Sequence, residues 1–130
     1  MRRRIALVAI LLAWSSQSAI ASQTACVFEG GKAPQYYELE FIGYSDIDPM
    51  IVFSSTAFGS GKRINLHPEH YTLRNFSQKA RSVSLKFDNP NDPALPPSFS
   101  LTGTGGVAWL TIGSGTNRPG TIQGVLACDF

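Results

Sequence analysis

The sequence has little charge and few residues of the types that carry out catalysis. Only 15% of its 130 residues are Asp, Glu, Lys or Arg, and there are two cysteines and two histidines. No stretch shows sustained helical periodicity. The longest apolar run, residues 5–14, would form only about 15 Å of helix, which is too short to cross a bilayer. Neither a Gly-x-Ser-x-Gly elbow nor a Cys-x-x-Cys pair is present, so the hydrolase and dithiol-redox classes that depend on them are not expected.

The start of the chain has the pattern of a secretory signal peptide. Three arginines at residues 2–4 precede the apolar run, and a short polar stretch then ends in Ala-Ile-Ala at Ala21. Basic, apolar and small-residue segments in this order predict cleavage after Ala21. We therefore expect Sec-type export to the periplasm or the exterior, with residues 1–21 removed and no transmembrane segment in the remaining chain.

Residues 22–130 are expected to form a single β domain. Removal of 21 residues from 130 leaves 109, which is enough for one modest core. Three of the eleven basic residues leave with the signal peptide, so the net charge changes from +2 to about −1. An electrostatic case for binding nucleic acid or an anionic membrane is therefore absent.

The two cysteines, Cys26 and Cys128, lie near opposite ends of this domain. An even number of cysteines in an oxidising compartment favours a disulfide, here one that ties the N- and C-terminal strands together. Two free thiols remain the alternative.

Glycine and proline divide residues 22–130 into short segments, which predicts an all-β fold. We expect a single-domain antiparallel β-sandwich or barrel of about eight strands. Strict alternation in residues 36–42 directs Tyr37, Leu39 and Phe41 to one face. Residues 81–87 alternate in the same way.

The C-terminal half is predicted to be an antiparallel meander of the segments 81–87, 98–102, 107–112 and 121–128. The third of these is apolar enough that both of its faces are expected to be covered. Gly124 is expected at a bulge. Residues 24–28 would pair beside the last strand if the disulfide forms.

Five residues are the candidates for a binding surface: Lys62, Arg63, His67, His70 and Tyr71. His67 and His70 are separated by a proline and a glutamate, so they lack the shared helical face of a metalloprotease motif. They are interpreted as surface residues of a turn, with a zinc or copper site as the alternative. No metal or other cofactor is expected.

Lys62 and Arg63 lie in the segment Ser-Gly-Lys-Arg-Ile, residues 60–64. Over these five residues the chain resembles the Ser-Gly-x-Arg-Tyr-like loop of small periplasmic inhibitors of c-type lysozyme. Ile64 replaces the tyrosine of that loop, and the rest of the chain does not follow the family. The resemblance implies a basic loop that could enter an acidic cleft.

These observations favour an exported, non-enzymatic β-domain that binds another macromolecule through its loops, in an inhibitor-like or immunity-like role. The partner would be a protein or another component of the cell envelope, and the chain is expected to be monomeric. One alternative is a calycin-like barrel that binds a small hydrophobic ligand in a cavity lined by aromatic residues. Another is a structural subunit of a surface assembly, which would need an unpaired edge strand.

Overall fold

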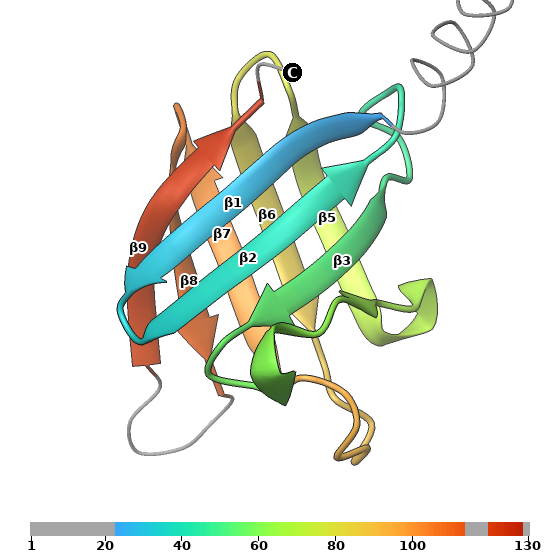
Figure 1. Ribbon diagram of the computed structural model, residues 1–130. Coiled ribbons are helices and arrows are strands. Elements are labelled where there is room, and N and C mark those ends of the chain that lie inside the picture. Colours follow the sequence, from blue (N-terminus) through green and yellow to red (C-terminus); the bar gives the residue numbers. More distant parts are fainter. Residues whose placement is uncertain (1–22, 114–119, 129–130) are drawn as a thin grey trace, which may run out of the picture.

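The computed structural model describes residues 23–113 and 120–128, which form one antiparallel sheet of nine strands. The sheet is curled into a half-barrel (Figure 1). The predicted signal peptide, and most of the loop between the last two strands, lie outside the described residues. The all-β prediction is confirmed. The strands are β1 Thr24–Lys32, β2 Gln35–Ile42, β3 Met50–Ser55, β4 Ile64–Asn65, β5 Tyr71–Ser77, β6 Ser82–Phe87, β7 Phe99–Thr104, β8 Val107–Ile112 and β9 Gly120–Ala127; two short 3₁₀ turns are η1 Gly59–Gly61 and η2 Pro68–His70.

The order of strands in the sheet is β4-β3-β2-β1-β9-β8-β7-β6-β5. Every pair of neighbours is consecutive in the chain except β1 and β9, which join the two halves of the sheet. The predicted meander of β6 to β9 is confirmed, and so is the pairing of the N-terminal strand with the C-terminal one. The sheet curls so that β1 to β3 pack across β5 to β7 (Figure 1).

The disulfide lies at the end of the β1–β9 ladder. Val27 pairs with Ala127, so the antiparallel register brings the preceding Cys26 opposite the following Cys128, and the two are bonded. They are 102 residues apart in the chain. The predicted disulfide is confirmed, and it ties the one strand pair that unites the two halves of the sheet.

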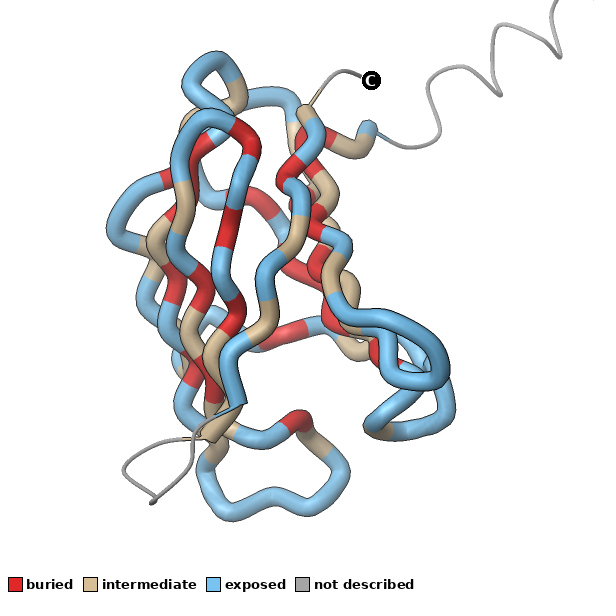
Figure 2. Tube along the Cα trace, turned by 90° about the vertical axis from the view of Figure 1, so that its left-hand side faces the viewer, coloured by how far each residue is buried: buried red, intermediate tan, exposed pale blue. Residues whose placement is uncertain are grey.

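Phenylalanine side chains fill the interior between these halves. Figure 2 shows buried and exposed residues alternating along the strands, as expected when one face of each strand meets the core. The Phe53 and Phe99 rings stack with centroids 5.6 Å apart, and Phe87 stacks on Phe99 at 5.3 Å. The predicted alternation holds for Leu39 and Phe41 of β2 and for Val83, Leu85 and Phe87 of β6, which are buried. Tyr37 is only half-buried, and Ser82, which was expected to be exposed, is buried.

Two expectations for the C-terminal strands are wrong. One face of β8 is not covered, because Val107 and Trp109 remain 43% and 46% exposed on the outside of the half-barrel. There is no bulge at Gly124, which pairs in register with both Ala108 and Gly30. The glycine is needed for space, because a Cβ there would come within 2.6 Å of the Phe28 ring.

Candidate functional site

The half-barrel stays open between β3 and β5, and a groove of about 730 Å³ lies along this seam. β4 covers only two residues of β3, Val52 and Phe53, so the sheet does not continue to β5. One wall of the groove is the edge of β5, at Tyr71, Thr72 and Leu73. The opposite wall is apolar and contains Pro49, Met50, Leu66 and Pro68. Asp48 completes the lining.

The loop between β2 and β3 stands beside this groove and carries two strongly exposed apolar side chains. Tyr44 and Ile47 are each 78% exposed, and Met50, which follows the loop and lines the groove, is 51% exposed. Large apolar side chains that gather at one place on a surface mark sites of interaction more often than scattered ones do. We call the loop residues 43–49 together with the groove the seam face.

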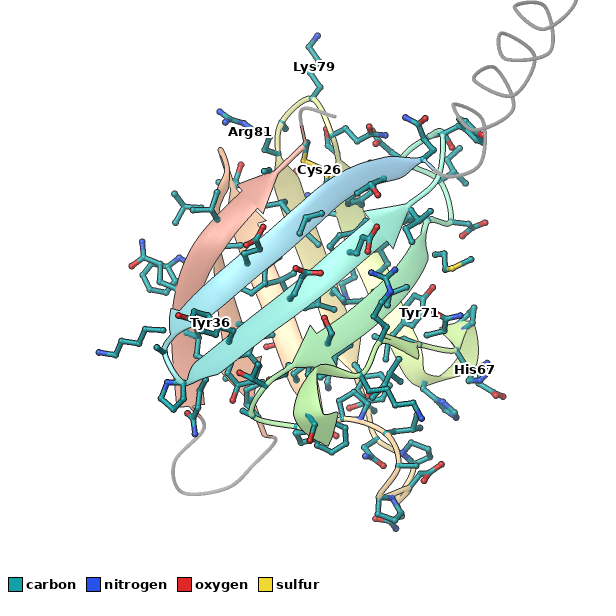
Figure 3. The ribbon with its side chains drawn as sticks, viewed as in Figure 1. Cys26, Tyr36, His67, Tyr71, Lys79 and Arg81 are labelled. Atoms are coloured by element: carbon teal, nitrogen blue, oxygen red, sulfur yellow. A yellow bond between two sulfur atoms is a disulfide. The ribbon has the colours of Figure 1, made fainter. Side chains whose placement is uncertain are left out.

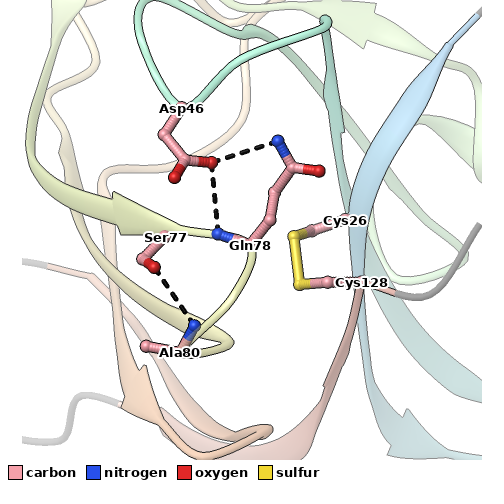
Figure 4. Close-up of a disulfide and its surroundings, with 6 residues drawn as sticks. All are labelled: Cys26, Asp46, Ser77, Gln78, Ala80 and Cys128. Atoms are coloured by element: carbon pink, nitrogen blue, oxygen red, sulfur yellow. Dashed lines mark hydrogen bonds between the residues drawn. A yellow bond between two sulfur atoms is a disulfide. The ribbon is translucent and has the colours of Figure 1, made fainter.

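Hydrogen bonds hold the loop at its start, within it and at its middle. The Gly43 N–H donates to the Gln23 carbonyl at 3.0 Å, and the Ile47 N–H donates to Ser45 Oγ at 3.2 Å. One carboxylate oxygen of Asp46 accepts both the backbone N–H and the side-chain amide of Gln78, at 3.1 Å each (Figure 4). The backbone that carries Tyr44 and Ile47 is therefore restrained before a partner binds, which lowers the entropic cost of binding.

The electrostatics of the groove centre on Tyr71 and Asp48. Tyr71 is half-buried at the start of β5. Its burial, and secondly the negative charge of Asp48, raise the pKa of the Tyr71 hydroxyl above its usual value. At neutral pH the hydroxyl is therefore a neutral donor at the groove wall, next to a carboxylate acceptor.

The two histidines lie at the end of the seam face, around η2. The His70 N–H donates to the His67 carbonyl at 2.9 Å, and the ring centroids are 6.1 Å apart. Figure 3 labels His67 and Tyr71 at this side of the half-barrel. Across residues 23–113 and 120–128, no three His, Cys, Asp or Glu side chains gather in a way that could hold a metal ion. Of the five predicted binding residues, the structure brings His67, His70 and Tyr71 together, and Tyr71 alone of these lines the groove.

Lys62 and Arg63 come before β4 and do not line the groove. Lys62 is exposed after η1. Arg63 Nη1 donates to Glu40 Oε1 at 2.7 Å on the outer face of β2, while Glu40 Oε2 accepts from the Thr24 hydroxyl at 2.7 Å. Burial alone would raise the pKa of Glu40, but these hydrogen bonds outweigh it and lower the pKa. Arg63 is therefore paired within the chain, whereas the loop resemblance implied a cation directed toward a partner.

Glu38 lies on the same outer face, but its pKa is shifted in the opposite direction. It pairs directly with Glu29 on β1. Burial first, and then the charges of Glu29 and Glu40, raise the pKa of Glu38. The outer face of β1 and β2 is therefore acidic, and its like charges are only partly compensated.

Analysis of the sequence did not identify Tyr44 and Ile47. Residues 44–49 have the composition of an ordinary turn, and the groove depends on the distance between β3 and β5, which no local pattern records. The sequence did contain one local signal. Two large apolar side chains lie within a short acidic turn, where there is no core for them to pack into.

Comparison of the chain with protein-family models, with curated proteins and with solved structures finds no match. In the described part of the chain, no helix is long and apolar enough to span a membrane. The disulfide is compatible with a periplasmic or extracellular protein. The function is therefore argued from the seam face itself.

Proposed function

We propose that the chain is an exported, non-enzymatic binding module that holds a protein partner at the seam face. The observation that carries this proposal is the pair Tyr44 and Ile47, both 78% exposed on a loop that is hydrogen-bonded in place beside an apolar groove. Binding energy at protein interfaces is concentrated in a few such anchors, tyrosine prominent among them. The disulfide and the packed aromatic interior supply the rigid scaffold that presents them.

An inhibitor-like or immunity-like role fits this arrangement, because a rigid loop with two apolar anchors can occupy a concave surface of an enzyme. His67 and His70 would contact the partner at the end of the groove. Lys62 would be peripheral, and Arg63 would act only if its ion pair with Glu40 opened.

The calycin-like alternative has less support, because it needs an interior cavity. In the described residues, Phe28, Phe41, Phe53, Phe87 and Phe99 occupy the space between the two halves, and none of them is more than 2% exposed. Trp109 is exposed on the outer face of β8, so its fluorescence would report poorly on a ligand inside the half-barrel.

A comparison of three forms of the immobilised chain tests the proposal. Wild type, a Tyr44→Ser/Ile47→Ser double variant and a Val107→Ser/Val125→Ser double variant are each exposed to an envelope extract of the exporting cell. Val107 and Val125 are also exposed apolar residues, but they face outward on β8 and β9, away from the seam face.

The expected result is a protein retained by wild type and by the β8–β9 variant and lost by the loop variant. With that protein purified, the loop variant should raise Kd by about 30-fold or more, the effect of losing one interface anchor. The proposal fails if no protein is retained, or if the loop variant retains it as well as wild type does.

A further inference from the structure

The edge of β5 that faces the groove has backbone groups without a strand partner. Asp88 N–H donates to the His70 carbonyl at 2.8 Å, so His70 and Asp88 form a hydrogen-bonded pair at the start of the β5–β6 ladder. Such pairs alternate with non-hydrogen-bonded ones along an antiparallel ladder. Tyr71, which opposes Phe87, therefore directs its N–H and C=O groups away from β6 and toward the seam. The N–H of Leu73, which opposes Leu85, points the same way, and the register of the ladder shifts after Leu73.

Other contacts of the seam agree with this orientation. The Tyr71 N–H donates to the Pro68 carbonyl, and the Gln78 N–H donates to Asp46 beyond the other end of β5. Both ends of the edge are thus capped by neighbouring segments. Between the caps, the Tyr71 carbonyl and the Leu73 N–H open on the groove, and no strand of the described chain pairs with them.

The opposite wall of the groove cannot offer a matching ladder. Pro49 and Pro68 have no N–H, and the Ile51 carbonyl already accepts from the Leu66 N–H at 2.9 Å. The groove therefore has one wall that can pair with an extended backbone and one wall that can only contact side chains. This asymmetry is what a single added strand requires.

We propose that the groove binds an extended segment of the partner protein, which pairs with β5 at Tyr71 to Leu73 and fills the seam. This inference rests on the proposed function and specifies the form of the partner. Every second side chain of the segment would be apolar, to meet Leu73 and the wall of Pro49, Met50 and Leu66. The segment would carry no carboxylate near Asp48, the acidic residue of the lining.

A second copy of this chain is a poorer occupant. Its own β5 edge also lies at the side of a groove flanked by η2 and the wall of Pro49, Met50 and Leu66. Two such recessed edges cannot reach each other without opening both grooves. A free peptide segment has no such flanks, so it can enter.

The test uses a pair of variants at Leu73. Leu73→Pro removes the N–H that faces the groove, while the ladder to β6 does not use that group. Leu73→Ala removes a comparable amount of side chain and keeps the N–H. The probe is a phage-displayed library of random linear nonapeptides, selected on the purified wild-type chain.

We expect enriched peptides with apolar residues at alternate positions and few carboxylates. They should bind Leu73→Pro about tenfold more weakly than Leu73→Ala. The proline removes one hydrogen bond between the peptide and β5, and its ring crowds the bound peptide. Saturating peptide should also slow hydrogen exchange of the Leu73 amide in the wild-type chain, a measurement that does not depend on the proline variant folding.

The inference is overturned if no peptide is enriched, if both variants bind equally, or if exchange at Leu73 does not change. Self-association of the wild type that Leu73→Pro abolishes, measured by sedimentation, would make a second copy the occupant and would also overturn it. Retention of a partner that depends on Tyr44 and Ile47, without any peptide binding, would refute only this inference and leave the proposed function in place.

Discussion

Asp46 and Gln78 are joined across the open seam by two hydrogen bonds of 3.1 Å, although they are 32 residues apart in the chain. Asp46 belongs to the loop that carries Tyr44 and Ile47, and Gln78 follows directly after β5 (Figure 4). In the described chain no backbone ladder links these two sides of the half-barrel, so the contact stabilises both the loop and the capped end of the β5 edge.

Replacing Asp46 should therefore loosen the loop more than it destabilises the fold. Asp46→Ala is expected to lower the free energy of unfolding by about 1 kcal/mol, because it removes an acceptor at an exposed site. Hydrogen exchange at residues 44–48 should accelerate at the same time. Asp88→Ala is the control, since the Asp88 side chain makes no hydrogen bond within the described residues; an equal effect of both variants, in urea titrations and exchange, would contradict the role of Asp46.

Reducing the Cys26–Cys128 disulfide should destabilise the protein strongly. The bond closes a loop of about 100 residues, for which the chain-entropy model gives about 4 to 5 kcal/mol. It also ties β1 to β9, which among the strands of residues 23–113 and 120–128 are the only neighbours that are not consecutive in the chain. Urea unfolding with and without reductant measures the difference, and a Cys26→Ala/Cys128→Ala variant should match the reduced protein.

The close packing of Gly124 against Phe28 should not tolerate an added methyl group. A Cβ at Gly124 would overlap the Glu29 carbonyl and lie 2.6 Å from the Phe28 ring. Gly124→Ala is expected to cost about 1 to 3 kcal/mol by overpacking. Gly120→Ala in the same strand is the matched control, because a Cβ there has no atom within 4 Å, so the change should be neutral or stabilising by about 0.4 to 1 kcal/mol.

The acidic outer face should make stability depend on pH in two opposite ways. The raised pKa of Glu38 means that its charge opposes folding above the ordinary carboxyl value of 4.5, so Glu38→Gln should stabilise the protein at pH 7. The expected gain is about 0.2 to 1 kcal/mol, the effect of removing a like charge directly opposite Glu29, and it should shrink in 1 M salt. The gain should vanish below about pH 4, where both states bind the proton.

Glu40→Gln should have the opposite sign. The lowered pKa of Glu40 means that its charge stabilises the fold above 4.5 and that this contribution is lost as the pH falls through the folded-state pKa. Because the Arg63 side of its ion pair is exposed to solvent, the expected loss at pH 7 is limited to about 1 kcal/mol. Urea midpoints of wild type and both variants from pH 3 to 7 measure these effects, and the same sign for both variants would refute this description of the face.

The sequence alone predicted which side chains enter the core wherever a strand alternates strictly. In β2, Leu39 and Phe41 are fully buried, as their spacing predicted, because successive side chains of a strand point to opposite faces. The disulfide was also predictable, since two cysteines in a chain that is expected to be exported have only each other as partners. The same reasoning failed for β8, where an apolar composition did not mean that both faces were covered.

Tertiary structure alone decided where the half-barrel stays open. β4 and β5 are consecutive in the chain, as are most paired strands, yet they do not pair. β4 ends after two residues and the chain turns away through η2, so the groove stays open between β3 and β5. Tyr44 and Ile47 become a candidate site only because Asp46 reaches Gln78 on the far side of that opening. Alternation is a local consequence of backbone geometry and can be read from a few residues. The position of an unpaired edge depends on the curvature and register of the whole sheet, and no single segment of the sequence encodes it.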